Sequence, residues 1–235
     1  MLPLSRLLFS PLLAGATLRD RVIACAGVAA GIGATAGLMT VFGAGASSLL
    51  APIGASAVLA FAVPSSPLAQ PWPVIGGNLV SALVGIAVAA LVPGVALAAG
   101  LAVAGAILAM SLARCLHPPG GAVALLAVLS AQGEVPLSPS LVGLNSLAIV
   151  AAAWAFHRAA GHACPHRADA RMATRELMAE GLAHQDVERA LADLGETFDI
   201  APEDLELLLA RAEHHAAERR KVGRPQGSRE ARQAA

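Results

Sequence analysis

The residues best suited to chemistry form one stretch inside an apolar region of the chain. They are His117, Pro118, Pro119, Gly120, Gly121 and Ala122. The two prolines remove backbone donors and break a helix, and the glycines let the backbone bend and approach another group closely. An ionisable side chain inside a membrane segment is by default a functional-site hypothesis, so we expect His117 to line a substrate path or to handle a proton. The plainer alternative is a histidine that only bonds a neighbouring carbonyl group.

A second stretch matches the first at an offset of 67 residues. Residues 52–60 and 119–127 are identical at six of nine positions, and the same offset relates Asn78 to Asn145. Matches at Pro, Gly and Asn arise by chance less easily than matches at Ala in an alanine-rich chain. We therefore predict an internal duplication.

The two stretches together define the candidate substrate-binding site. Its residues are Pro52, Gly54, Ala55, Ser56, Asn78, His117, Pro118, Pro119, Gly120, Gly121, Ala122 and Asn145. The Pro-x-Gly breaks predict two short helices whose starts offer unpaired N–H groups and the positive end of the helix dipole, a combination that binds anions. Two plainer readings stay open: Ser56 bonds only within its own helix, and Asn78 and Asn145 only join neighbouring helices.

The elements that must position this site lie in a membrane. The 235-residue chain is 56% hydrophobic and 14% charged, with a mean hydropathy of +0.66, too apolar for an ordinary soluble domain. Between Val22 and Phe156 the only Asp, Glu, Lys or Arg residues are Arg114 and Glu134. The net charge of zero gives no sign of a nucleic-acid partner.

Glycine, proline and polar clusters divide the apolar region into six segments. They cover about residues 22–42, 50–63, 74–92, 95–112, 119–130 and 140–156. A full crossing needs about 20 helical residues, so the second and fifth segments are short, broken helices. We expect an all-α, polytopic membrane bundle of about six spans, in two inverted three-span repeats over residues 21–92 and 93–158.

Basic residues set the expected orientation. With six crossings, Arg6, Arg19, Arg21, Arg114 and Arg158 all fall on one side, which the positive-inside rule makes cytoplasmic. Both termini are then cytoplasmic in a multi-pass protein of the cell inner membrane. If the two short segments instead dip and return, four crossings remain and Arg114 lies outside. Arg114 is therefore either a topology anchor or a gating residue.

The ends of the chain differ from its apolar body. Residues 1–20 read as an interfacial amphipathic lead-in rather than a signal peptide, because Pro11 interrupts the apolar run and only Arg6 precedes it. Residues 159–222 predict a small, helical cytosolic tail, with helices near 169–180, 185–194 and from Pro202, and residues 223–235 read as disordered. Apolar faces are expected at positions 187, 191 and 194 of one tail helix and at 205, 208, 209 and 212 of the next.

Other kinds of site find little support in the sequence. The spacing of His157, His162, Cys164 and His166 matches no strong zinc pattern, so we expect no metal there. No Ser/His/Asp set, paired carboxylates or phosphate loop is present, so we expect neither an enzyme nor a cofactor.

At these residues the chain resembles the HPP integral membrane proteins, over about residues 12–158. The resemblance rests on residues 52–56 (Pro-Ile-Gly-Ala-Ser), 64–71 (Pro-Ser-Ser-Pro-Leu-Ala-Gln-Pro), 76–77 (Gly-Gly) and 117–121 (His-Pro-Pro-Gly-Gly). Plastid members of that family look like nitrite transporters, so the resemblance implies transport.

We therefore expect a membrane transporter or channel for a small inorganic anion such as nitrite. The alternative is a membrane-embedded ligand sensor or scaffold that signals through the helical tail. The expected partners are membrane lipid and the small anion, and a homo-oligomer stays open.

Overall fold

The computed structural model describes residues 17–43, 45, 48–133, 137–161, 164–166, 178, 181–195 and 197–222. Four expectations fall wholly or largely outside these residues. They are the lead-in before residue 17, the Glu134 loop, the tail helix at 169–180 and the disordered end from residue 223. Every regular element in the part of the chain that is described is helical.

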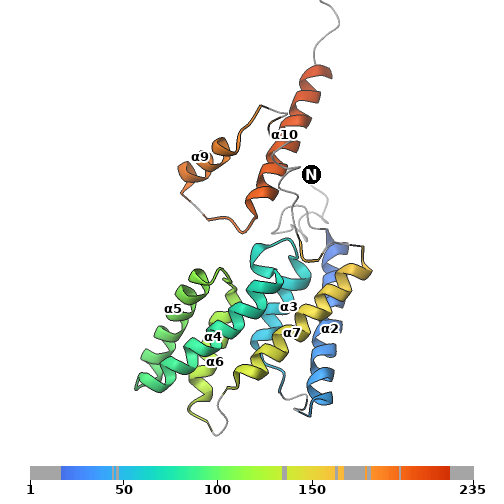
Figure 1. Cartoon of the computed structure of the whole chain (residues 1–235). Coiled ribbons are helices and arrows are strands. Elements are labelled where there is room, and N and C mark those ends of the chain that lie inside the picture. The colour runs from blue at the N-terminus through green and yellow to red at the C-terminus, as the bar shows by residue number, and fades with distance from the viewer. Residues whose placement is uncertain are drawn as a thin grey trace, which may run out of the picture. The chain divides into compact units, whose positions relative to one another are not determined.

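The described residues of the membrane body form six α-helices and one short 3-10 helix (Figure 1). They are α2 (Leu18–Val41), α3 (Pro52–Ala62), η2 (Pro67–Ala69), α4 (Pro71–Leu91), α5 (Val95–Leu112), α6 (Pro118–Ser130) and α7 (Pro139–Ala159). In length and composition α2, α4, α5 and α7 could each cross a membrane, whereas α3 and α6 are shorter apolar helices. The all-helical, multi-pass membrane fold is therefore confirmed, while the crossing of α3 and α6 stays a prediction.

Local sequence explains where these helices begin. Four of them (α3, α4, α6 and α7) start at a proline, which suits the first helical position because its missing N–H has no partner there anyway. The start of α2 instead uses a capping box, in which Thr17 Oγ1 accepts from the Asp20 N–H at 3.2 Å. Asp20 Oδ2 accepts in return from the Thr17 N–H at 2.9 Å.

Small residues let the long helices approach their neighbours closely. The buried stripe of α5 consists of Ala98, Ala102, Ala106 and Met110. On α2, a Cβ added at Gly27 or Gly31 would lie 2.6 Å from the Phe61 ring of α3, so these glycines make room for that ring. A Cβ added at the neighbouring Gly33 or Gly37 would meet nothing within 4 Å, so the close packing of α2 is confined to Gly27 and Gly31 among these four glycines.

The third helix of each predicted repeat packs against the other repeat. In the first repeat (α2, α3, α4), α4 contacts α5 and α6, and in the second (α5, α6, α7), α7 contacts α2 and α3. Contacts between α4 and α7 and between α3 and α6 then join the two groups. This arrangement is unchanged when the repeats are exchanged, which supports the predicted duplication.

Burial follows the same offset of 67 residues. The buried residues of α3 are Pro52, Ile53, Ser56, Ala57, Ala60 and Phe61. Those of α6 are Pro119, Gly120, Val123, Ala124, Ala127 and Val128. Each residue of the second set lies 67 positions after a residue of the first, so the two short helices present corresponding faces to the bundle.

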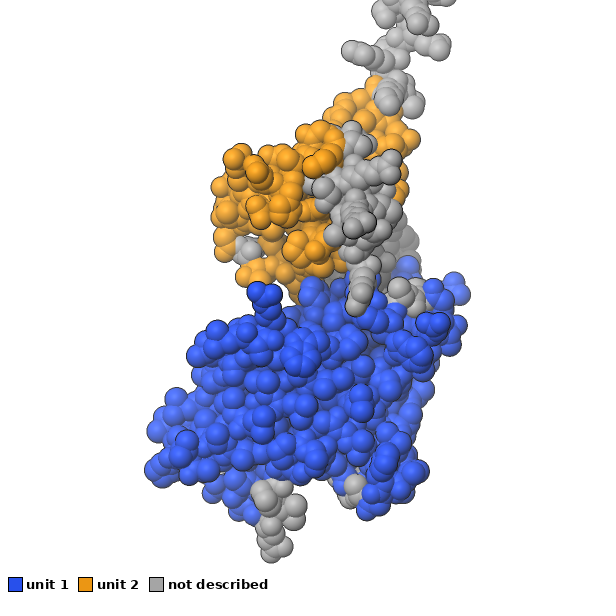
Figure 2. All heavy atoms as spheres, viewed as in Figure 1, with its two compact units in different colours: residues 1–167 blue, residues 168–235 orange. Residues whose placement is uncertain are grey.

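The chain forms two compact units, Met1–Arg167 and Ala168–Ala235 (Figure 2). The second contains α9 (His184–Leu194) and α10 (Pro202–Val222), and Val187 and Ala210 are buried between these helices. The expected apolar stripe of α10 is wrong in part, because Leu208 is 59% exposed whereas Glu206 is only 3% exposed. The face of α10 that includes Glu206 and Ala210 packs inward, so a carboxylate outside the expected stripe is buried while Leu208 of that stripe is exposed.

Candidate functional site

His117 lies fully buried at the start of α6, where it is the N-cap residue. Its Nδ1 atom lies 2.8 Å from the Leu68 carbonyl oxygen, and its Nε2 atom lies 2.9 Å from Ser56 Oγ of α3. Because a carbonyl oxygen only accepts, Nδ1 carries the proton and Nε2 of the neutral ring accepts from the Ser56 hydroxyl. His117 does bond a carbonyl, as the plainer reading held, but one 49 residues away in sequence.

The loop before α4 places the Leu68 carbonyl. Ser66 Oγ accepts from the Leu68 N–H at 3.1 Å and so caps η2. Gln70 Nε2 donates to the carbonyl oxygens of Pro64 and Ser66, each at 2.9 Å. The polar residues of this proline-rich loop therefore bond the loop to itself, which fixes the acceptor that orients the His117 ring.

Asn78 of α4 extends the polar contacts from α3 to α7. Its Nδ2 group donates to Ser56 Oγ at 3.3 Å and to Ser146 Oγ at 3.0 Å. All four side chains (His117, Ser56, Asn78 and Ser146) are fully buried, and we call them the polar chain. The polar chain sits where α3, α4, α6 and α7 meet. Among the described residues, Asn78 Oδ1 is a buried side-chain oxygen without a hydrogen-bond partner.

Asn145 of α7 has a different role from its counterpart Asn78. Its Oδ1 atom accepts from the Leu50 N–H at 3.2 Å, and its Nδ2 group donates to the Ser48 carbonyl at 3.1 Å and the Leu141 carbonyl at 2.9 Å. Asn145 therefore holds the segment that leads into α3 and lies apart from the polar chain. The helix-joining alternative therefore describes Asn78, whereas Asn145 bonds the segment before α3 and its own helix.

Backbone amides at the starts of the short helices are already bonded. The N–H groups of Ile53 and Gly54 donate to the carbonyls of Leu50 and Ala51, each at 3.0 Å. The Gly120 N–H donates to the His117 carbonyl at 2.8 Å, and the two prolines before it have no N–H. The expectation of unpaired amides is therefore wrong for these three groups, and side chains supply the polar contacts instead.

Close backbone approach occurs at Gly120, as expected, and at Gly77, but not at Gly54 or Gly121. A Cβ added at Gly54 would meet nothing within 4 Å, and one at Gly121 would meet only Val103 Cγ1 at 3.7 Å. At Gly77 of α4 an added Cβ would lie 2.6 Å from the Cys115 carbonyl oxygen and from His117 Cβ. At Gly120 it would lie 2.5 Å from Ser81 Oγ. The tight contact is thus between α4 and the start of α6.

The remaining candidate residues divide by exposure. Pro52 and Pro119 are buried, whereas Ala55, Ala122 and Pro118 are exposed. Arg114 is exposed too, and it ends α5 with a positive φ of 52°. Sequence reasoning missed Ser146, although it directly follows Asn145, and it missed the Leu68 carbonyl, for which a backbone acceptor gives no sequence signal.

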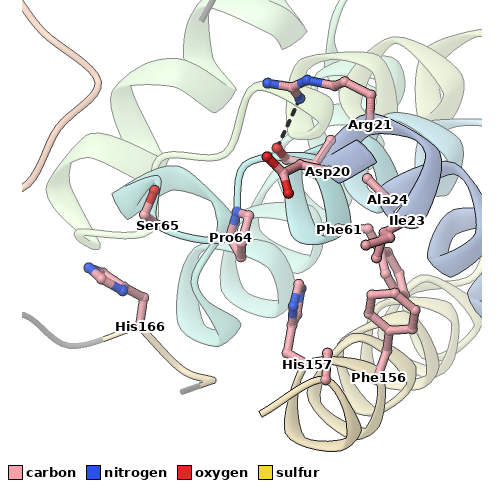
Figure 3. Close-up of a pocket in the computed structure, with 12 residues that line it drawn as sticks. Asp20, Arg21, Ile23, Ala24, Phe61, Pro64, Ser65, Phe156, His157 and His166 are labelled. Atoms are coloured by element: carbon pink, nitrogen blue, oxygen red, sulfur yellow. Dashed lines mark hydrogen bonds between the residues drawn. The ribbon is translucent and has the colours of Figure 1, made fainter. Parts of the chain in front are cut away.

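A cavity of about 380 Å³ opens elsewhere in the body, between the start of α2 and the ends of α3 and α7 (Figure 3). The rings of Phe61 and Phe156 meet edge to face in its wall, with centroids 5.4 Å apart. Arg21 Nη1 donates across it to the Ala62 carbonyl at 3.1 Å. His157 and His166 also line it, whereas no residue of the predicted site does. No three His, Cys, Asp or Glu side chains gather as metal ligands in the described part of the chain.

Comparison with known proteins gives one family match. The family model described as "HPP, transmembrane region" matches residues 14–165. Two proteins of Dictyostelium discoideum, each named a transmembrane protein, are 46% and 44% identical to this chain over 88 residues, or 36% of its length. The matched segment covers only 28% and 31% of those relatives. No solved structure matches.

Proposed function

The chain belongs to the HPP transmembrane family, and from this premise we propose that it transports a small inorganic anion such as nitrite. The anion crosses the cell inner membrane chemically unchanged, and both termini of the protein lie in the cytoplasm. Membrane lipid and the transported anion are its partners in this proposal.

The observation that carries the proposal is the buried polar chain. His117 caps α6 and Ser56 lies early in α3, so their 2.9 Å contact brings the starts of two short helices to one place. Discontinuous helices whose starts meet inside the bundle are typical of secondary transporters. Polar side chains are costly inside a membrane and mark substrate paths there.

Charge supports an anion rather than a cation. The dipoles of α3 and α6 place their positive ends at this junction. Between Val22 and Phe156 the sequence contains one carboxylate, Glu134, and helices α3 to α7 contain none. A bound cation would therefore lack the acidic partner that cation pathways provide.

The close packing of α4 against the start of α6 also favours a small substrate. Gly77 and Gly120 let α4 and α6 approach so closely that even a methyl group does not fit at either position. A path that opens between these helices by a small movement admits an ion of few atoms more readily than a large metabolite. Nitrite has this size. It is also the anion of a weak acid, and a histidine beside it can carry the proton that moves with it.

Flux into proteoliposomes that contain only this protein tests the proposal. We expect uptake of nitrite above the leak of protein-free vesicles, with nitrate, formate and chloride tested in parallel as competitors. Ser56→Ala should lower the flux, whereas Ser111→Ala should not, because Ser111 is exposed and donates only to its own helix at Ile107. Binding of nitrite without flux would contradict transport and favour the sensor that signals through the tail.

A further inference from the structure

With His117 neutral, each hydrogen bond of the polar chain has one direction. The Leu68 carbonyl can only accept, so the His117 ring carries its proton on Nδ1. The neutral ring then accepts at Nε2 from the Ser56 hydroxyl at 2.9 Å, closer than the alternative acceptor, the Pro52 carbonyl, at 3.5 Å. With its single proton used, Ser56 Oγ can only accept from Asn78. The Asn78 amide must therefore turn Nδ2 toward the two serines and Oδ1 away from them.

This orientation leaves the Asn78 amide oxygen as a buried acceptor without a hydrogen bond. Asn78 is fully buried and its Oδ1 atom has no partner among the described residues. A buried polar atom without a hydrogen bond costs about 1–3 kcal/mol, and such an atom calls for an explanation. The counterpart Asn145 shows that the same side chain can be satisfied in this fold, because its Oδ1 atom accepts from Leu50.

Building on the transport function above, we propose that Asn78 contacts the substrate and that protonation of His117 reverses the polar chain. With His117 neutral, Asn78 Oδ1 accepts the O–H of the undissociated weak acid. With His117 protonated, the amide is turned over and Asn78 Nδ2 donates to the anion. The substrate therefore crosses as an anion and a proton together.

The reversal keeps every contact of the polar chain. The proton leaves the oxygen of the acid and ends on His117 Nε2, which then donates to Ser56 Oγ. The Ser56 and Ser146 hydroxyls both turn to donate to the Asn78 amide oxygen, which now occupies the former position of Nδ2. The amide Nδ2 takes the unpartnered position and faces the anion. No electron is exchanged, and the summed charge of ring and substrate is zero in both states.

The surroundings add no other charge to this exchange. Helices α3, α4, α5 and α7, which pack around the start of α6, contain no Asp, Glu, Lys, Arg or His before His157 near the end of α7. On its own segment His117 has Cys115, which is buried, and Arg114, which is exposed. A lone anion at this junction would be desolvated without a countercharge, which is far more costly than a neutral pair. The movement of substrate should therefore be electroneutral.

Membrane potential distinguishes this mechanism from movement of the bare anion. Nitrite uptake into proteoliposomes is measured under a potassium–valinomycin potential of either sign and, separately, under a pH gradient. One uncompensated charge in a potential of about 100 mV would change nitrite accumulation about 50-fold. We expect no change with potential and faster uptake when the inside is alkaline. A flux that follows the potential would overturn the inference and leave anion transport itself standing.

Variants separate the protein path from diffusion of the undissociated acid. Asn78→Leu removes the amide at similar volume, so vesicles with this variant should take up nitrite no faster than protein-free vesicles. Ser111→Ala serves as the matched control and should retain the parental flux. Elution as one sharp peak and an unfolding midpoint at or above the parental value would show that Asn78→Leu is folded. Parental flux through folded Asn78→Leu would overturn the assignment of Asn78.

A binding measurement tests the same inference without flux. Nitrite added to the purified protein near pH 7 in weak buffer should take up about one proton for each anion bound, as the reversed polar chain requires. His117→Gln keeps a polar side chain but cannot gain a proton, so its proton uptake should vanish. Proton uptake without flux would support the inference and refute transport. Binding without proton uptake would refute the inference.

Discussion

Asn145 accepts a hydrogen bond from the Leu50 backbone at 3.2 Å, and these two residues are the counterparts of Asn78 and His117 at the 67-residue offset. The same asparagine position thus serves two purposes in the two halves. In the second half, Asn145 holds the segment that leads into α3. In the first half, Asn78 joins the side chains of the polar chain. Each asparagine lies about 10 Å from the start of its helix. The segment that Asn145 holds and the polar chain are therefore at similar depths, measured from opposite ends of the bundle.

The first prediction concerns Asn145. Asn145→Ala removes the acceptor of the Leu50 N–H in a part-buried position. We expect the protein in detergent to lose about 1–3 kcal/mol of stability. Thermal unfolding monitored by tryptophan fluorescence measures this loss, and Ser111→Ala provides the reference for a serine that bonds only its own helix. An unchanged thermal unfolding midpoint for Asn145→Ala would contradict the role of Asn145 in holding the segment before α3.

The second prediction concerns glycine positions. Gly77→Ala places a methyl group 2.6 Å from the Cys115 carbonyl and from His117 Cβ, so α4 and the start of α6 must separate. Overpacking of this kind costs about 1–3 kcal/mol, and we expect nitrite flux to be lost. Gly54→Ala is the matched control, because nothing lies within 4 Å of its added Cβ. Equal flux in the two variants would refute the importance of the α4–α6 contact.

The third prediction concerns topology. In a background without Cys25, Cys115 and Cys164, a cysteine at exposed position 132 should react with a membrane-impermeant reagent from outside, and one at exposed position 65 should not. Labelling at both positions from outside would establish four crossings, with α3 and α6 re-entrant. Permeabilised cells provide the control that position 65 is reactive.

The fourth prediction concerns pH and the tail. A hydrogen bond from His184 to the buried Glu206 carboxylate, aided by Glu188, raises the pKa of His184 above its ordinary value of 6.5. A pKa raised by folding stabilises α9 on α10 fully below pH 6.5, and this contribution is lost as the pH rises through the folded-state pKa. Hydrogen exchange in the full chain should therefore show less protection of α9 at pH 9 than at pH 6. Glu206→Gln should abolish the difference, and its persistence would refute the pairing.

The sequence predicted local features better than contacts. Prolines at helix starts are local signals, and they correctly indicated the two short helices. Glycine in the sequence reveals backbone freedom but not what lies opposite, so close approach was correctly expected at Gly120 but missed at Gly77. The Leu68 carbonyl was invisible for the same reason, because its partner is 49 residues away.

The tail illustrates a different limit. A helical stripe of leucines suggested a buried face, yet Leu208 of that stripe is 59% exposed. The Glu206 carboxylate is buried because His184 supplies a partner from the other helix, and no periodicity in α10 contains that information.

Helices α4 and α7 each pack against the other half of the body, so the two halves depend on each other for stability. If the halves arose by duplication, a single half would lack cover for its third helix unless a second copy lay beside it in the opposite orientation. A chain severed at the turn between Pro93 and Gly94 should accordingly yield two fragments that are unstable when made separately and that reassemble when made together. Reassembly would identify the smallest complete unit of this architecture as a pair of halves, whether or not a peptide bond connects them.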